Sequence, residues 1–138
     1  RTARDVYYGG EGPTREKMRT LITRLEWCDA ERLPEETLDM RYQQSLDPEE
    51  TALAAMSDSP RGEWQDLTQQ LSLIEAPTLF IWGREDAFLT PDYPMMLARM
   101  VKRGNLHVMD NVSHHLQEER PAAYHAVVTG FFTASQHP

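Results

Sequence analysis

Two short apolar runs in the second half of the chain predict a pair of β-strands. The first run, residues 78–82, follows a proline and consists of β-branched, aromatic and aliphatic residues, and the second covers residues 106–109. Apolar runs of this length without strict alternation are typical of strands that are covered on both faces. We therefore expect two buried, parallel strands.

The segment between these runs has the pattern of an amphipathic helix. Thr90 and Pro91 predict its start, as an N-cap followed by proline at the first helical position, and Gly104 predicts its end. Its apolar residues recur at helical spacing: Tyr93, Met96, Leu97 and Met100. A strand, a crossover helix and a parallel strand form a unit that is right-handed in roughly 98% of cases. The carboxyl ends of both strands then lie at one edge of the sheet, where open α/β sheets place their sites.

The first half of the chain is predicted to be helical after an irregular lead-in over residues 1–12. Thr14 has the position of an N-cap, and the helix that follows carries an apolar stripe made of Met18, Leu21, Ile22 and Leu25. A second helix begins at Pro34, with acidic residues in its first turn. A third begins at Asp47 and reaches about Met56.

Residues 57–62 form the clearest break in the pattern, because they combine serine, aspartate, proline and glycine. We place a boundary there, between a helical region of residues 1–62 and an α/β region of residues 63–138. Beyond the break, residues 67–74 predict a short amphipathic helix. Residues 119–121 open a last helix whose apolar residues share one face: Tyr124, Val127, Val128 and Phe131.

Composition narrows the class of partner. The formal charge of −8, with acidic residues interleaved among fewer basic ones, argues against nucleic-acid binding and favours a small molecule. No apolar run approaches the roughly 18 residues of a membrane span. The single cysteine, Cys28, excludes an internal disulfide and fits a reducing compartment, so we expect a cytoplasmic protein that does not contact a membrane.

Asp86 and His114 are the residues whose positions suggest catalysis. Each follows one of the two predicted strands, so the topology brings both to the same sheet edge. Taken alone, Asp86 is explained more simply by a solvated turn, and His114 by a surface or capping histidine. Taken together, they match the acid and the base of a hydrolytic triad, in which a carboxylate holds the imidazole in one tautomer.

The other histidines are weaker candidates. The physics of the sequence does not rank His115 against its neighbour His114 as the base. His107 falls inside a predicted strand, where a packed or hydrogen-bonded structural role is expected. His125 lies in the last helix and His137 in the tail, and neither is expected to act.

Arg41 has two interpretations. It is either an exposed arginine among acidic helix neighbours or a guanidinium that binds a substrate carboxylate through two hydrogen bonds. Cys28 has no base beside it in the sequence, so we expect a buried, inert thiol. No H-x-x-x-H or C-x-x-C spacing and no glycine-rich phosphate loop occurs, so neither a metal nor another cofactor is expected.

Three segments of the second half resemble the C-terminal end of α/β-hydrolases: residues 76–89, residues 106–109 and residues 113–119. Within that fold they are most similar to the meta-cleavage product hydrolases, which split carbon–carbon bonds in ring-fission products of aromatic degradation. Residues 13–16 and 33–45 are similar, more loosely, to the helical lid of that family. The resemblance thus implies the C-terminal part of a parallel α/β-hydrolase sheet, preceded by part of a lid.

The resemblance also assigns roles to residues. It makes Asp86 the triad acid, His114 the base and Arg41 the anchor of the substrate's carboxylate end. Two departures stand out, because Ser113 replaces the usual glycine and His115 stands where these enzymes carry a tryptophan that lines the pocket. His115 is therefore expected to contact the substrate. Because it replaces the tryptophan, the resemblance does not identify the substrate's side group.

The sequence contains no Gly-x-Ser-x-Gly nucleophile motif. In α/β-hydrolases the chain order is serine, acid, histidine, so the serine would belong upstream. The resemblance then implies hydrolysis of a 2-hydroxy-6-oxo-dienoate-type carboxylate by a Ser-His-Asp triad whose serine an N-terminal segment of the same hydrolase supplies. Loss of the serine alone in subtilisin costs about as much rate as loss of the whole triad, so this chain by itself would be inactive.

Two alternatives remain open. An epoxide hydrolase or haloalkane dehalogenase has a similar core and histidine but an aspartate nucleophile. A non-catalytic interaction module would use the acidic helical region as a binding surface. A chain with only part of a parallel sheet would expose strand edges, so we also expect association, most simply as a homo-oligomer.

Overall fold

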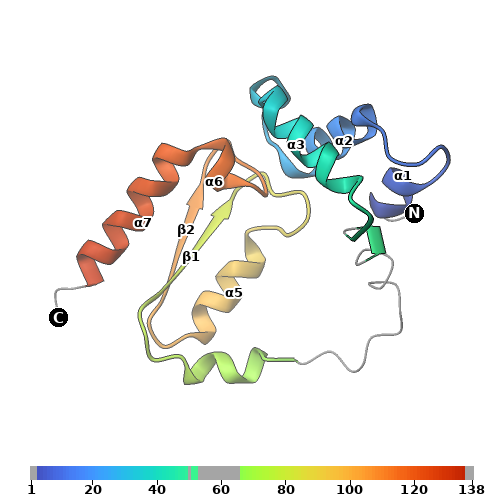
Figure 1. Ribbon diagram of the computed structural model, residues 1–138. Helices are drawn as coiled ribbons and strands as arrows, with labels where there is room; N and C mark the ends of the chain where they lie inside the picture. Colours follow the sequence, from blue (N-terminus) through green and yellow to red (C-terminus); the bar gives the residue numbers. More distant parts are fainter. Residues whose placement is uncertain (1–2, 50, 53–65, 136–138) are drawn as a thin grey trace.

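A computed structural model describes residues 3–49, 51–52 and 66–135. Figure 1 shows two groups of elements, a set of helices from the first part of the chain and a two-stranded sheet with its own helices from the second. The helices of the first group are α1 (Ala3–Tyr8), α2 (Arg15–Leu21), a π-helical turn (Ile22–Glu26), a 3-10 turn (Ala30–Arg32) and α3 (Glu35–Ser45).

The N-terminal helices form where their capping residues place them, with one exception. The Thr14 side chain accepts a hydrogen bond from the backbone N–H of Lys17 at 3.2 Å, and Pro34 precedes the first residue of α3, so both predicted helix starts are confirmed. The predicted irregular lead-in is wrong, because α1 occupies residues 3–8. Packing explains the difference: Tyr7 is buried, and its hydroxyl lies 2.5 Å from Oγ of Ser45.

These helices share one apolar core. It consists of Tyr7, Met18, Ile22, Trp27, Leu33 and Leu38, all buried. The predicted stripe therefore supplies only two of the core residues, Met18 and Ile22, and the others come from α1, α3 and the turns. Burial of this mixed set stabilises the short helices, since isolated helices of this length are marginal in water.

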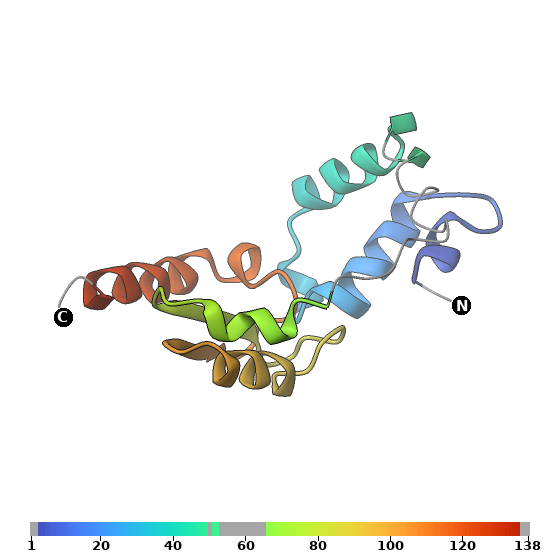
Figure 2. The ribbon, with the colours of Figure 1, turned by 90° about the horizontal axis from the view of Figure 1, so that it is seen from below.

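The second group is built on the predicted strand–helix–strand unit. Strands β1 (Thr78–Gly83) and β2 (Gly104–Met109) are parallel, in a register that pairs Thr78 with Gly104 and Gly83 with Met109. The other elements are a 3-10 helix (Thr68–Leu73), α5 (Asp92–Met100), α6 (Leu116–Glu119) and α7 (Pro121–Ser135). Figures 1 and 2 show α5 and α7 on opposite sides of the sheet. No helix in the described ranges is long and apolar enough to cross a membrane.

Three details of the strand–helix–strand unit differ from the prediction. The helix begins at Asp92 with Pro91, not Thr90, at the N-cap position, and Thr90 contributes only its backbone carbonyl, which accepts the N–H of Tyr93. Gly104 does not end the helix: it is the first residue of β2, and a Cβ there would lie 2.1 Å from the carbonyl oxygen of Ala98. The strands are also less buried than expected, with Val108 38% exposed, because each pairs with only one neighbour among the described residues.

Two further predictions concern the middle of the chain. Residues 68–73 form a 3-10 helix rather than the predicted amphipathic helix, and Leu73 is largely exposed. Residues 48–49 and 51–52 are helical, as expected for the third helix, but its remainder and the break at residues 57–62 lie outside the described residues.

Candidate active site

The loops that follow β1 and β2 lie against each other at the carboxyl edge of the sheet. The backbone N–H of Arg84 donates to the carbonyl of Met109 at 2.9 Å, and the N–H of Glu85 donates to that of Val112 at 3.1 Å. Gly83 permits this approach, because a Cβ there would lie 2.0 Å from the carbonyl oxygen of Ser113. The two loops therefore form one hydrogen-bonded unit.

This unit brings Asp86 and His114 together. Nδ1 of His114 lies 3.0 Å from Oδ2 of Asp86, and the other oxygen, Oδ1, accepts the backbone N–H groups of Phe88 and Leu89 at 2.8 and 3.1 Å. The side chain of Asp86 is 4% exposed, whereas that of His114 is 38% exposed. The carboxylate is thus hydrogen-bonded through both oxygens, and the imidazole stays partly exposed to solvent.

The arrangement defines what the histidine can do. A carboxylate only accepts hydrogen bonds, so a hydrogen bond between the two side chains requires the proton on Nδ1 of His114, and in the neutral imidazole Nε2 is then the acceptor. A neutral imidazole oriented in this way can take a proton from a hydroxyl group and return it to a leaving group. The ring of Phe88 lies 4.8 Å from that of His114 and adds an apolar wall beside the imidazole.

Arg41 is not an isolated exposed arginine. Its guanidinium pairs with the carboxylate of Glu26, and its side chain is only 23% exposed. Nε2 of His115 lies 3.1 Å from the same oxygen of Glu26, and Nδ1 of His115 lies 3.6 Å from a carboxylate oxygen of Glu118. The two residues predicted to contact substrate, Arg41 and His115, therefore meet at one carboxylate.

The sequence prediction missed Glu26 and Glu119. The backbone carbonyl of Glu26 accepts the N–H groups of His114 and His115 at 3.2 and 3.4 Å. Glu119 binds in the opposite direction, since its carboxylate accepts the backbone N–H of Ser113 at 2.6 Å and that of Cys28 at 2.7 Å. These two glutamates join the N-terminal helices to the loop between β2 and α6, residues 110–115, which we call the histidine loop.

A signal for Glu26 was present in the sequence. Met18, Ile22 and Glu26 are spaced by four residues, so Glu26 continues the predicted apolar stripe, and an acid at such a position needs a partner. Nothing in the spacing, however, identified Arg41 and His115 as its partners.

The remaining candidates lie away from the Asp86–His114 pair. His107 is exposed on β2 and His125 is exposed on α7, while His137 lies outside the described residues. Cys28 is exposed, so the prediction of a buried thiol is wrong: Trp27 takes the buried position at the end of the π-helical turn, and the next residue faces solvent. Partial desolvation, and then the charge of Glu119, raise the pKa of this thiol.

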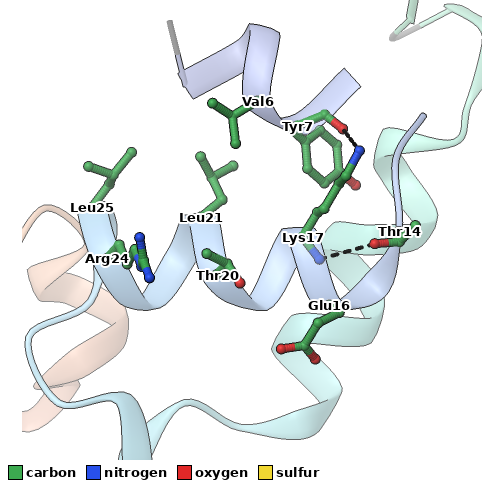
Figure 3. Close-up of a pocket in the computed structure, with 9 residues that line it drawn as sticks. All are labelled: Val6, Tyr7, Thr14, Glu16, Lys17, Thr20, Leu21, Arg24 and Leu25. Carbon is green, nitrogen blue, oxygen red and sulfur yellow. Dashed lines mark hydrogen bonds between the residues drawn. The ribbon is translucent and has the colours of Figure 1, made fainter. Parts of the chain in front are cut away.

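A separate cavity of about 350 Å³ lies among the N-terminal helices. Figure 3 shows it between α1 and the α2 region, with Val6, Leu21 and Leu25 facing it. Near it, Nζ of Lys17 donates to the carbonyls of Gly9 and Gly12 at 2.6 and 2.7 Å. None of the four predicted site residues lines this cavity. Within the described ranges no group of three potential metal ligands comes together.

Comparison with known proteins gives a consistent group of relatives, although no protein-family model matches the chain. A 2-hydroxy-6-oxononadienedioate/2-hydroxy-6-oxononatrienedioate hydrolase of Pseudomonas putida is 31% identical over 106 residues, which are 75% of this chain and 37% of that protein. The 2-hydroxymuconate semialdehyde hydrolase of Pseudomonas sp. strain CF600 is 32% identical over 127 residues, 88% of this chain and 44% of that protein. The chain therefore spans less than half the length of these curated relatives.

Solved structures agree on the fold. The meta-cleavage product hydrolase CumD of Pseudomonas fluorescens IP01 superposes with a TM-score of 0.77 at 25% identity, over 96% of this chain and 50% of that one. A bacterial membrane phospholipase A superposes with a TM-score of 0.79 over all of this chain and 42% of that one, at 20% identity, which supports the fold alone.

Proposed function

This chain belongs to the α/β-hydrolases and corresponds to the C-terminal portion of a meta-cleavage product hydrolase, and we propose that it carries the acid and the base of a carbon–carbon bond hydrolase. The proposed substrate is a 2-hydroxy-6-oxo-dienoate-type ring-fission product, the class named for its curated relatives. The observation that carries the proposal is the 3.0 Å contact between Nδ1 of His114 and the buried carboxylate of Asp86.

In the proposed mechanism water is added across a carbon–carbon bond. The dienol substrate is first ketonised. His114 then takes the proton of a serine hydroxyl, which attacks the carbonyl carbon or activates water to do so, and Asp86 stabilises the imidazolium. The bond to the neighbouring carbon breaks, and that carbon takes the proton from His114. In the serine-attack route, water then hydrolyses the acyl–serine ester with His114 again as the base, so the acyl fragment leaves as a carboxylic acid and the serine hydroxyl is restored.

Arg41 is the proposed anchor for the substrate's carboxylate. The guanidinium has five N–H donors, and its pairing with Glu26 uses one nitrogen, so others remain for a ligand. His115, next to the base, is proposed to contact the substrate as well. Arg41 and His115 would cover the carboxyl edge of the sheet in the core region, residues 63–138. The helices of the proposed lid region, residues 1–62, would cover it with them.

The nucleophile is proposed to lie outside the 138 residues, because they contain no Gly-x-Ser-x-Gly motif. Denaturing intact-mass spectrometry of the native preparation tests this point. We expect a longer polypeptide, or a companion of roughly domain size, about 100 to 200 residues, that carries the motif. An aspartate at the nucleophile position would instead indicate an epoxide hydrolase or a haloalkane dehalogenase.

Activity is tested on the complete enzyme, meaning this chain with its nucleophile-bearing segment. Turnover is followed by loss of the conjugated dienoate chromophore. We expect Asp86→Asn and His114→Ala to lower kcat by a factor of roughly 10³ to 10⁴, in line with triad variants of serine proteases. The matched control is Asp92→Asn, an exposed acid on α5. Full activity in both triad variants would rule out the proposed chemistry.

A further inference from the structure

Glu26 is the residue of the N-terminal helices that contacts both Arg41 and the histidine loop. Its side chain is 11% exposed, and one oxygen, Oε2, contacts both the guanidinium of Arg41 and Nε2 of His115. Its backbone carbonyl accepts the N–H of His114. A single residue thus binds the proposed carboxylate anchor through its side chain and the proposed base through its backbone.

The side-chain contacts of Glu26 have a physical reason. A carboxylate removed from water is costly unless charged or hydrogen-bonding partners replace the lost solvation. Arg41 supplies the charge and His115 supplies a second contact. The same contacts restrict Arg41, whose long side chain would otherwise lose rotamer freedom when it binds a ligand.

We propose that Glu26 is a positioning residue that fixes the guanidinium of Arg41 at a set distance from His114, and so makes the site selective for substrates that carry a carboxylate. This inference rests on the proposed function, because it needs Arg41 to bind the substrate's carboxylate. It adds a determinant of specificity that acts through Arg41 without touching the reacting atoms.

The position of Glu26 supports this role. It ends the π-helical turn, Ile22–Glu26, and its neighbour Trp27 is buried in the core of the N-terminal helices. Two residues farther on, the N–H of Cys28 is held by Glu119. The backbone on which Glu26 sits is therefore anchored on both sides, so its carboxylate is a fixed point from which Arg41 can be held.

The test compares two substrates in the complete enzyme carrying Glu26→Gln. One is a 2-hydroxy-6-oxo-dienoate, and the other is the same compound with its C1 carboxylate as the methyl ester, which does not need the anchor. We expect kcat/KM for the acid to fall about tenfold, mainly through a higher KM, while kcat/KM for the ester changes less than about twofold. Glu36→Gln, an exposed acid on α3, is the matched control and should change neither value.

Other outcomes overturn the inference in distinguishable ways. Equal losses for acid and ester mean that Glu26 only supports the fold of the histidine loop. A KM for the acid below the wild-type value means that Glu26 competes with the substrate for Arg41. If the wild-type enzyme turns over neither compound, the proposed function fails and the inference fails with it.

A double variant tests whether Glu26 acts through Arg41. In an Arg41→Gln background, which removes the anchor, the added Glu26→Gln change should no longer alter the preference for acid over ester. A further loss of that preference in the double variant would show that Glu26 acts independently of Arg41, and would overturn the proposed role.

Discussion

Glu119 binds the backbone N–H of Cys28 at 2.7 Å, although 91 positions separate the two residues in the chain. The other oxygen of the same carboxylate binds the N–H of Ser113, directly before the proposed base. In turn, the backbone carbonyl of Glu26, in the N-terminal helices, accepts N–H groups of the histidine loop. Two sets of hydrogen bonds, one from each side, therefore form the junction between the N-terminal helices and this loop.

We expect Glu119→Ala to destabilise this junction. The change removes two charge-assisted hydrogen bonds to backbone donors, each worth about 1.5 to 3 kcal/mol. Because the bond to Cys28 is exposed, we expect a loss at the lower end of their sum, about 3 kcal/mol in the free energy of unfolding. Chemical denaturation measures it. The control is Gln117→Ala on the exposed side of the same short helix, which should cost less than about 0.5 kcal/mol. Equal stability of the two variants would contradict the importance of the Glu119 bonds.

Gly83 and Gly130 should respond in opposite ways to alanine. A Cβ on Gly83 would meet the backbone oxygens of Ser113 and Val112 at 2.0 and 2.7 Å, so Gly83→Ala is expected to cost more than about 3 kcal/mol, the upper end of ordinary overpacking. A Cβ on Gly130, within α7, meets nothing within 4 Å. Gly130→Ala should therefore stabilise the helix by roughly 0.5 to 1 kcal/mol. Thermal denaturation of both variants checks the pair.

The elements with strong local signals were predicted correctly. Thr14 and Pro34 fixed two helix starts because capping geometry depends on neighbouring residues alone. The parallel pairing was predicted from the two apolar runs and the helix between them. This pairing places Asp86 and His114 at the same edge of the sheet. Their proximity follows from topology, whereas their catalytic role stays a prediction.

Features that depend on distant contacts were not accessible from the sequence. The helix α1 forms because Tyr7 packs into a core built mostly by later residues. Gly104 is needed for its close approach to Ala98, which spacing does not reveal. The spacing of Glu26 along the apolar stripe signals a need for a partner, but it does not identify Arg41, which lies 15 residues away in another helix.

The stability conferred by Glu35 should depend on pH. The guanidinium groups of Arg19 and Arg15 lower the pKa of this carboxyl to about 2. A group with a depressed pKa stabilises the fold above its unfolded value, about 4.3, and loses that contribution as the pH falls toward 2. Because Glu35 is exposed, the effect is small.

Glu35→Gln is therefore expected to lower the melting temperature slightly at pH 7 and to leave it unchanged near pH 2. Thermal melts of the variant and the wild-type protein across this range measure the difference. Glu36→Gln, at the neighbouring exposed position, is the control variant. A difference that grows as the pH falls would contradict the ion-pair explanation.

Cys28 should react slowly with alkylating reagents despite its exposure. Desolvation, and after it the negative charges of Glu119, Glu85 and Asp29, raise the pKa of the thiol above its ordinary value. The thiolate is the reactive form, so a raised pKa leaves less of it at pH 8. We expect the midpoint of the alkylation rate against pH to lie higher in the folded protein than in the urea-unfolded chain. Asp29→Asn should move the folded midpoint down, while Asp92→Asn should leave it in place. A folded midpoint at or below the unfolded one would mean that Glu119 and its neighbours do not surround the sulfur with negative charge.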